Sequence, residues 1–121
     1  MTPFDIGSQL VTLVRAGKGP EAIEKLYATD IVSVEAMAPP GGSAEQTGIA
    51  ACLAKGKHWR EINEIHAATV EGPFPHGDRF AVFLSYEITP RASGKRTTMR
   101  EIALYTVKND KIVREEFFYQ M

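Results

Sequence analysis

The fold is decided by the stretch that runs from Phe80-Ala-Val-Phe-Leu-Ser-Tyr-Glu-Ile88 through Thr97-Thr-Met-Arg-Glu-Ile-Ala-Leu-Tyr-Thr-Val107 to Ile112-Val-Arg-Glu-Glu-Phe-Phe-Tyr119. Aromatic and β-branched residues are frequent in all three segments, and such residues favour strands. Gly and Pro between the first two segments mark a turn, and Asn109-Asp110 tolerate the left-handed backbone that a tight hairpin needs. The stretch therefore predicts a curved antiparallel meander of three strands.

The first two thirds of the chain predict helices. Thr2 can cap a first helix that Pro3 opens, and Gly17 and Gly19 end it. Pro20 can open a short second helix that Asp30 closes. The remaining expectations are a strand over 31–36, a helix that starts after Thr47 and frays near Gly56 or runs to Trp59, a strand over 62–71, and a turn over 72–77. Helices followed by antiparallel strands predict one α+β domain over residues 1–121.

The bulk properties exclude several classes of protein. The chain is 44% hydrophobic and 24% charged, as soluble proteins are, and its formal net charge is -1 without long runs of either sign. Nucleic-acid binding is not expected, because it usually needs a basic face. A membrane helix is not expected either, since no apolar run approaches about 20 residues. A missing signal peptide and a lone Cys52 predict a cytoplasmic location.

The order of elements resembles that of the nuclear transport factor 2-like superfamily, in particular its SnoaL-like branch. The segments that carry the resemblance are Tyr27-Ala-Thr-Asp-Ile-Val32, Thr47-Gly48-Ile49, Tyr105 to Val113, and Glu115 to Tyr119. All of them are markers of the fold rather than of a reaction. The resemblance implies a cone-shaped, cystatin-like α+β barrel with an apolar pocket between helices and sheet, a small-molecule ligand and a homodimer formed through the outer face of the sheet.

Ketosteroid isomerase belongs to the same superfamily, but its catalytic groups are not found here. The positions that would correspond to its tyrosine, its carboxylate base and its second acid hold Leu10, Ala36 and Ala103. Stabilising a dienolate requires such groups, so that mechanism is not expected unless Glu35 or Glu101 has taken over.

The register of the last hairpin determines which glutamate shares a face with Glu101. A three-residue loop with a bulge places Glu115 on that face, whereas a two-residue loop places Glu116 there and exchanges Tyr119 for Phe118. In both cases a pair of carboxylates lies among aromatic side chains. A carboxylate in apolar surroundings has a raised pKa and can serve as a general acid or base.

Candidate site residues follow from these faces. The candidates for catalysis are Glu101, Glu35, His66 and Glu115, and those for ligand binding are Tyr27, Trp59, Phe80, Tyr86, Tyr105, Phe117 and Tyr119. No metal site is predicted, because the histidines lack ligand spacing, and no cofactor motif is found. The leading hypothesis is a cofactor-free acid/base enzyme for a small, largely apolar metabolite. The alternative is a non-catalytic ligand-binding or dimerising module. The outer face of the sheet, through which two copies would pair, is expected to carry Ile102, Leu104, Ile112 and Phe118.

Overall fold

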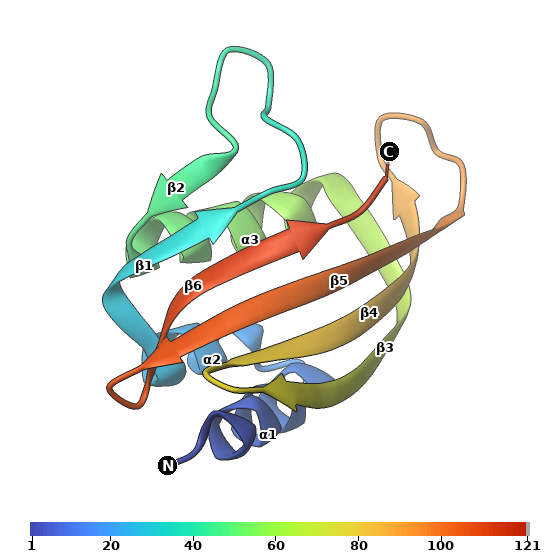
Figure 1. Cartoon of the computed structure of the whole chain (residues 1–121). Coiled ribbons are helices and arrows are strands. Elements are labelled where there is room, and N and C mark those ends of the chain that lie inside the picture. The colour runs from blue at the N-terminus through green and yellow to red at the C-terminus, as the bar shows by residue number, and fades with distance from the viewer. Residues whose placement is uncertain (121) are drawn as a thin grey trace.

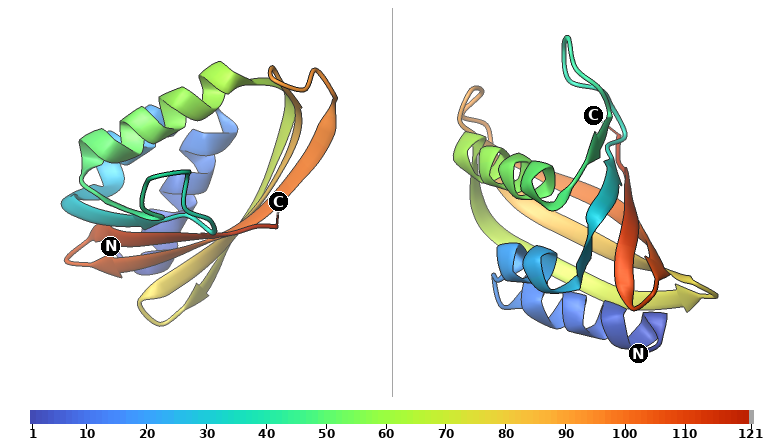
Figure 2. Two further views of the ribbon diagram at one scale, coloured as in Figure 1. Left: turned by 90° about the horizontal axis from the view of Figure 1, so that it is seen from above. Right: turned by 90° about the vertical axis from the view of Figure 1, so that its left-hand side faces the viewer.

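Figure 1 shows the computed structural model, which describes residues 1–120, as three helices on one side of a curved, six-stranded sheet. The elements are α1 (Pro3–Arg15), α2 (Gly19–Leu26), β1 (Tyr27–Val34), β2 (Glu45–Thr47), α3 (Ile49–Ile62), β3 (Asn63–His76), β4 (Arg79–Pro90), β5 (Thr97–Lys108) and β6 (Lys111–Phe118). The predicted α+β architecture is confirmed. The sheet itself does not close into a ring, and the helices cover its concave side (Figure 2).

The sheet has the strand order β2-β1-β6-β5-β4-β3. From β3 to β6 it is the predicted antiparallel meander, whereas β1 pairs with β6 in parallel. The parallel pairing brings the first strand of the chain against the last one, so residues that lie far apart in sequence face the same interior space. Among residues 1–120, no helix is both long and apolar enough to cross a membrane.

The start of α1 is fixed by local chemistry, as predicted. The Thr2 hydroxyl accepts a hydrogen bond from the Asp5 backbone N–H at 3.1 Å, and the Asp5 carboxylate accepts one from the Thr2 N–H at 2.9 Å. This reciprocal capping box satisfies N–H groups that have no partner within the helix, and Pro3 occupies the first turn, where no N–H is needed.

Three expectations about the middle of the chain are wrong. Helix α3 continues through Gly56 to Ile62, and residues 45–47 form the short strand β2, which was not expected. The segment 72–77 is not a turn as a whole: β3 continues to His76, and only Gly77-Asp78 turns the chain. Glycine and proline were interpreted as the end of the strand, but β3 continues through them, and its register with β4 shifts between Glu71 and Phe74, as it also does between Ile65 and Ala67.

The β5–β6 hairpin combines the two alternatives for its register. Its turn has two residues, Asn109 and Asp110, both with the left-handed backbone of a tight hairpin (φ 53° and 61°). A bulge then follows, because Val107 pairs with Ile112 while Thr106 pairs with Arg114. The extra residue restores the register that places Glu115, rather than Glu116, on the inner face. It also turns Ile112 into the core, so the prediction that Ile112 lies on the outer face is wrong.

Gly7 lies in the middle of α1, where the helix meets β3. A Cβ atom at this position would come within 2.7 Å of Pro73 Cβ and 3.0 Å of Phe80 Cδ2. Alanine normally stabilises a helix interior by about 1 kcal/mol relative to glycine, but overpacking costs about 1–3 kcal/mol. We expect Gly7→Ala to lower the free energy of unfolding in urea, whereas Gly19→Ala, which meets no atom within 4 Å, serves as the control and should not lower it. An unchanged or raised stability of Gly7→Ala would show that α1 can move away from β3.

Candidate active site

The innermost polar group of the sheet is the Glu115 carboxylate, which β6 turns toward the helices. Its side chain is almost fully buried, and three groups surround it. Tyr27, at the start of β1, donates its hydroxyl to Oε1 at 2.6 Å, and Ser33 donates its hydroxyl to Oε2 at 3.2 Å. The Cys52 thiol of α3 lies 3.9 Å from Oε2. Tyr27 and Ser33 are more than 80 positions before Glu115 in the sequence. They reach its carboxylate because β1 runs beside β6.

Burial governs the protonation of this inner group. It raises the pKa of Glu115, and the hydroxyl of Tyr27 opposes that shift by stabilising the anion. Burial also raises the pKa of the Cys52 thiol to about 11, with the Glu115 charge as the next cause. The thiol is therefore neutral near pH 7, and Cys52 does not act as a thiolate nucleophile in this state.

Lys55 is the cation of the site. Its ammonium donates to the Ser33 hydroxyl oxygen at 2.5 Å and forms an ion pair with the Glu35 carboxylate at 2.6 Å. It also lies 5.0 Å from the centre of the Phe117 ring. Glu35 accepts a second hydrogen bond, from the Tyr119 hydroxyl at 2.9 Å. The Lys55 and Glu35 side chains keep 23% and 25% of their surface exposed, so this layer of the site can be reached from solvent.

Glu101, on β5, differs from the other two carboxylates because no hydrogen bond or ion pair holds its side chain within residues 1–120. Burial raises the pKa of Glu101 to about 7, and the nearby charges of Glu35 and Glu115 add to that effect, while Lys55 opposes it. A carboxyl group with this pKa is present in both protonation states near neutral pH. We refer to Glu35, Glu101 and Glu115 as the carboxylate cluster.

The predicted ligand-binding residues fall into two layers. Tyr27, Phe80 and Tyr105 are fully buried, and the Phe80 and Tyr105 rings stack at 4.9 Å between centroids, so this layer is part of the core. The outer layer is only partly buried and consists of Trp59, Tyr86, Phe117 and Tyr119. The Trp59 and Tyr86 rings are 5.0 Å apart and tilted by 58°. This outer layer and Glu101 are the parts that a bound molecule would touch.

His66 does not lie with the other candidates. It is exposed on β3, and its Nε2 is 2.7 Å from the Thr89 hydroxyl oxygen of β4. The structure therefore separates His66 from the carboxylate cluster. In residues 1–120, no group of three His, Cys, Asp or Glu side chains is arranged to hold a metal ion.

A profile of the SnoaL-like domain matches residues 1–119 of the chain. The chain belongs to the SnoaL-like family. A crystal structure is known for a relative from Mesorhizobium loti that is 43% identical in sequence to this chain. That relative is provisionally described as a SnoaL-like polyketide cyclase, with carbohydrate phosphatase in brackets. The two structures superpose with a TM-score of 0.92, and the match covers 98% of this chain and 100% of that one. No protein of curated function matches the chain.

More distant structures share the fold of this SnoaL-like protein. An NTF2-like protein from Burkholderia thailandensis has 20% identity and a TM-score of 0.83, with 99% of this chain and 92% of that one covered. A protein from Catenulispora acidiphila with a ketosteroid isomerase-like fold, crystallised with trimethylamine, has 19% identity and a TM-score of 0.74, with 100% and 88% covered. The domain match thus confirms the predicted SnoaL-like family, and these structures show that its fold is shared more widely.

Sequence reasoning missed two polar residues of the SnoaL-like site, Ser33 and Lys55. Ser33 lies two positions after Ile31 on β1, and residues two apart on a strand share a face. Both are fully buried, so this spacing would have placed the Ser33 hydroxyl inward. Lys55 follows Cys52 by three positions, which is the spacing of one helical face. Lys55 lay within the expected helix, but only apolar residues of that helix were assigned to its inner face.

Proposed function

We propose that this SnoaL-like protein is an acid/base enzyme that needs no cofactor and acts on a small, largely apolar metabolite, with Glu101 transferring the proton. The observation that carries the proposal is the state of Glu101: a mostly buried carboxyl group with a pKa raised to about 7 and no hydrogen-bond partner among residues 1–120. A group that transfers protons is most effective when its pKa lies near the working pH.

The other members of the cluster have supporting roles in this proposal. The Glu35 carboxylate is held by Lys55 and Tyr119, and the Glu115 carboxylate by Tyr27 and Ser33, so both have fixed orientations. Their charges disfavour ionisation of Glu101 and keep its proton available for transfer. The partly buried rings of Trp59, Tyr86 and Phe117 supply an apolar surface for the substrate, with reactions of the isomerase, cyclase, dehydratase or hydrolase type as candidates.

The relatives agree with this reading in general terms. The Mesorhizobium loti relative carries the provisional description of a SnoaL-like polyketide cyclase. A more distant protein of the same fold, TerC, was co-crystallised with polyporic acid, at 17% identity and a TM-score of 0.72. Both support a small-molecule ligand for the present chain.

A non-catalytic binding module is the second candidate. It is favoured by the residues found where ketosteroid isomerase would have its acid groups: Leu10 and Ala103 are buried in the core, and Ala36 is an exposed alanine. A binding module needs only the aromatic layer and no titrating group.

The two candidates differ in whether a metabolite is consumed. The experiment is to incubate a cell extract with the protein, with Glu101→Gln and with Glu64→Gln, and to compare the metabolites by mass spectrometry. Glu64 is an exposed glutamate at the start of β3 and is the matched control. A compound that changes with the unmodified protein and with Glu64→Gln, but not with Glu101→Gln, supports the enzyme. A compound that is retained by all three proteins and never converted supports the binding module.

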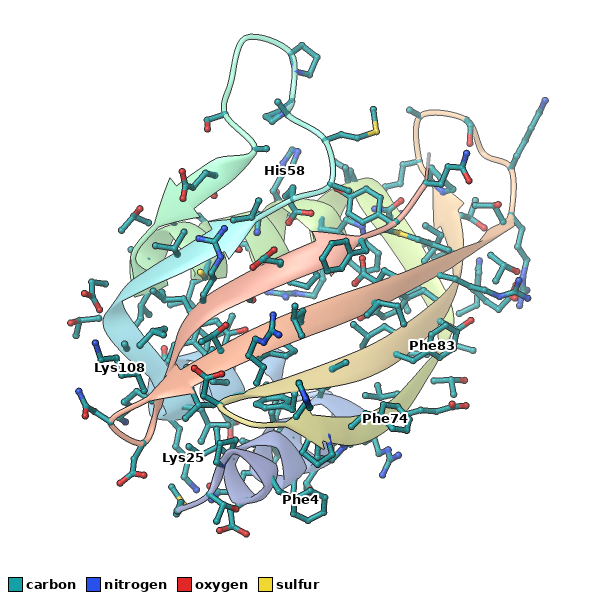
Figure 3. All side chains as sticks on the ribbon, in the orientation of Figure 1. Phe4, Lys25, His58, Phe74, Phe83 and Lys108 are labelled. Atoms are coloured by element: carbon teal, nitrogen blue, oxygen red, sulfur yellow. The ribbon has the colours of Figure 1, made fainter. Side chains whose placement is uncertain are left out.

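We also propose that the protein forms a homodimer through the outer face of its sheet, the face turned toward the viewer in Figure 3. Phe83, Ile102 and Phe118 are cross-strand partners on β4, β5 and β6 and form one apolar row. Ile102 is 40% exposed and Phe118 52%. Apolar residues that adjoin one another in this way commonly mark an interface.

Phe118→Glu should abolish this dimer, because it places a charge in the apolar row. Light scattering at micromolar concentration is expected to give a dimer for the unmodified protein and a monomer for the variant. Phe4→Glu, which changes an exposed phenylalanine of α1, is the control and should remain a dimer. An unmodified protein that is already monomeric would refute the proposal.

A further inference from the structure

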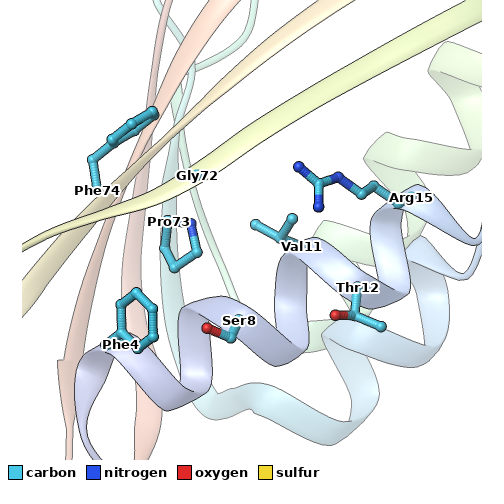
Figure 4. A pocket seen from close by; sticks show the side chains of 8 residues that line it. All are labelled: Phe4, Ser8, Val11, Thr12, Arg15, Gly72, Pro73 and Phe74. Atoms are coloured by element: carbon cyan, nitrogen blue, oxygen red, sulfur yellow. The ribbon is translucent and has the colours of Figure 1, made fainter.

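A hollow of about 420 Å³ lies between α1 and β3, outside the carboxylate cluster. Its lining residues are Phe4, Ser8, Val11, Thr12, Arg15, Gly72, Pro73 and Phe74. Figure 4 shows Phe4 and Phe74 at one end and Arg15 at the other. The hollow has the size of sites that hold small ligands, which span about 300–1,000 Å³.

The guanidinium group of Arg15 is fixed in position but keeps free donors. Its Nε and Nη2 donate to the Val70 carbonyl oxygen at 3.0 and 2.7 Å, which fastens the side chain to β3. A guanidinium group has five N–H bonds, so further donors remain. Within residues 1–120, no carboxylate lies within ion-pair distance of Arg15. The positive charge at this end of the hollow is therefore not neutralised by an ion pair within the described residues.

The opposite end of the hollow is apolar. Phe4 and Phe74 are 50% and 57% exposed, although phenylalanine rings are usually covered. Pro73 and Val11 continue the apolar wall between the phenylalanines and Arg15 (Figure 4). Phe4 and Arg15 are eleven residues apart on one helix, so the apolar and charged ends are separated by up to about 16 Å along its axis.

We propose that this hollow is a second ligand site, which binds an unbranched aliphatic carboxylate of medium length. The carboxylate would take the free N–H donors of Arg15, since a guanidinium group pairs well with two carboxylate oxygens. The chain would cover Val11, Pro73 and the Phe4 ring, while Phe74 points away from α1 at the edge of the hollow (Figure 4). This inference is independent of the proposed function, because none of the hollow's residues belongs to the carboxylate cluster.

The proposal is tested by NMR titration of the ¹⁵N-labelled protein with three probes of one length: octanoate, octanol and octylammonium. Octanoate is expected to shift the amide signals of Ser8, Val11 and Arg15 in a saturable manner. Octanol should bind at least tenfold more weakly, and octylammonium more weakly still, because Arg15 repels it. Equal affinity for all three probes would overturn the role of Arg15.

Three variants complete the test. Arg15→Gln is expected to weaken octanoate at least tenfold and to leave octanol unchanged, whereas Arg79→Gln, which changes an exposed arginine of β4, should leave both unchanged. Thr12→Trp fills the hollow from an exposed helical position and should weaken both probes, which keeps the test valid if Arg15→Gln is unstable. The proposal is overturned if octanoate binds Arg15→Gln and Thr12→Trp as tightly as it binds the unmodified protein. It is also overturned if octanoate shifts the signals of Trp59 and Glu101 instead of those of the hollow. A shift of the hollow's signals with protein concentration alone would overturn it too, because a second copy of the chain would then cover the hollow.

Discussion

Replacing Glu101 with glutamine is expected to abolish turnover and, at pH 8, to stabilise the fold. Loss of a general acid or base typically costs about 10²–10⁴-fold in rate. The stability effect follows from the raised pKa of Glu101, about 7 in the folded protein against a model value of 4.5. The folded state holds this proton more tightly than the unfolded chain does, so the contribution of Glu101 to stability is fully present below pH 4.5 and is lost as pH rises through about 7.

Glutamine keeps the shape of the side chain and removes the ionisation. Above pH 7 the unmodified protein must hold a buried anion at this position, at a cost of about 3 kcal/mol for the difference between the two pKa values. The variant avoids that cost. Melting both proteins from pH 4 to pH 9 should give stabilities that agree at the acid end, separate between pH 4.5 and about 7, and differ by a constant amount above that, with Glu101→Gln the more stable.

The control for this prediction is Glu64→Gln, which should follow the unmodified protein at every pH. Titration of the Glu101 carboxyl carbon by NMR measures the pKa itself. A normal or lowered pKa, together with a destabilised Glu101→Gln variant, would mean that the ionised carboxylate forms a structural pair, and it would favour the binding module over the enzyme.

Replacing Lys55 with methionine is expected to have the second largest effect, in the opposite direction. The ammonium pairs with Glu35, donates to Ser33 and lowers the pKa of Glu101. Methionine retains the apolar stem and leaves the carboxylate cluster without a cation. Removing one partner of a buried ion pair costs about 3–5 kcal/mol, and we expect a smaller loss, of about 2 kcal/mol at pH 8, because Lys55 and Glu35 are partly exposed to screening solvent.

The loss should shrink as pH falls, since protonated carboxyl groups no longer need the cation. The pKa of Glu101 should rise above about 7 in Lys55→Met and return toward it in Lys55→Arg, which restores the charge. Lys57→Met, two residues further along α3 on an exposed position, is the control. A Glu101 pKa that is the same in Lys55→Met and in the unmodified protein would contradict the electrostatic role of Lys55.

Much of the fold could be predicted from sequence because its signals are local. The capping of α1 by Thr2 and the meander from Phe80 to Tyr119 depend on neighbouring residues, and both are confirmed. The errors arose where tertiary contacts decide. Pairing with β4 keeps Gly72 and Pro73 within β3, and the bulge after Ile112 reverses the side of the sheet that this residue faces.

The candidate site was predicted in part. The sequence pattern indicated the three carboxylates. It did so for Glu101 and Glu115 because they alternate with aromatic residues on strands, and for Glu35 because it lies near the end of a strand. The partners of these carboxylates could not be assigned, because Tyr27 and Ser33 meet Glu115 only through the parallel pairing of β1 with β6. The local pattern of β3 suggested an inward histidine, but His66 is exposed and bonded to Thr89.

The position of β6 in the middle of the sheet has a consequence for how the chain is made. Residues 111–118 leave the ribosome after every other element, yet they separate β1 from β5 in the finished sheet. Until they emerge, β1 has no partner strand other than the three residues of β2. The nascent protein must therefore keep two unpaired strand edges open, and edges of this kind attract other chains. A chaperone that covers exposed strands during synthesis would therefore protect this protein more than it would protect a protein whose last strand lies at the edge of its sheet.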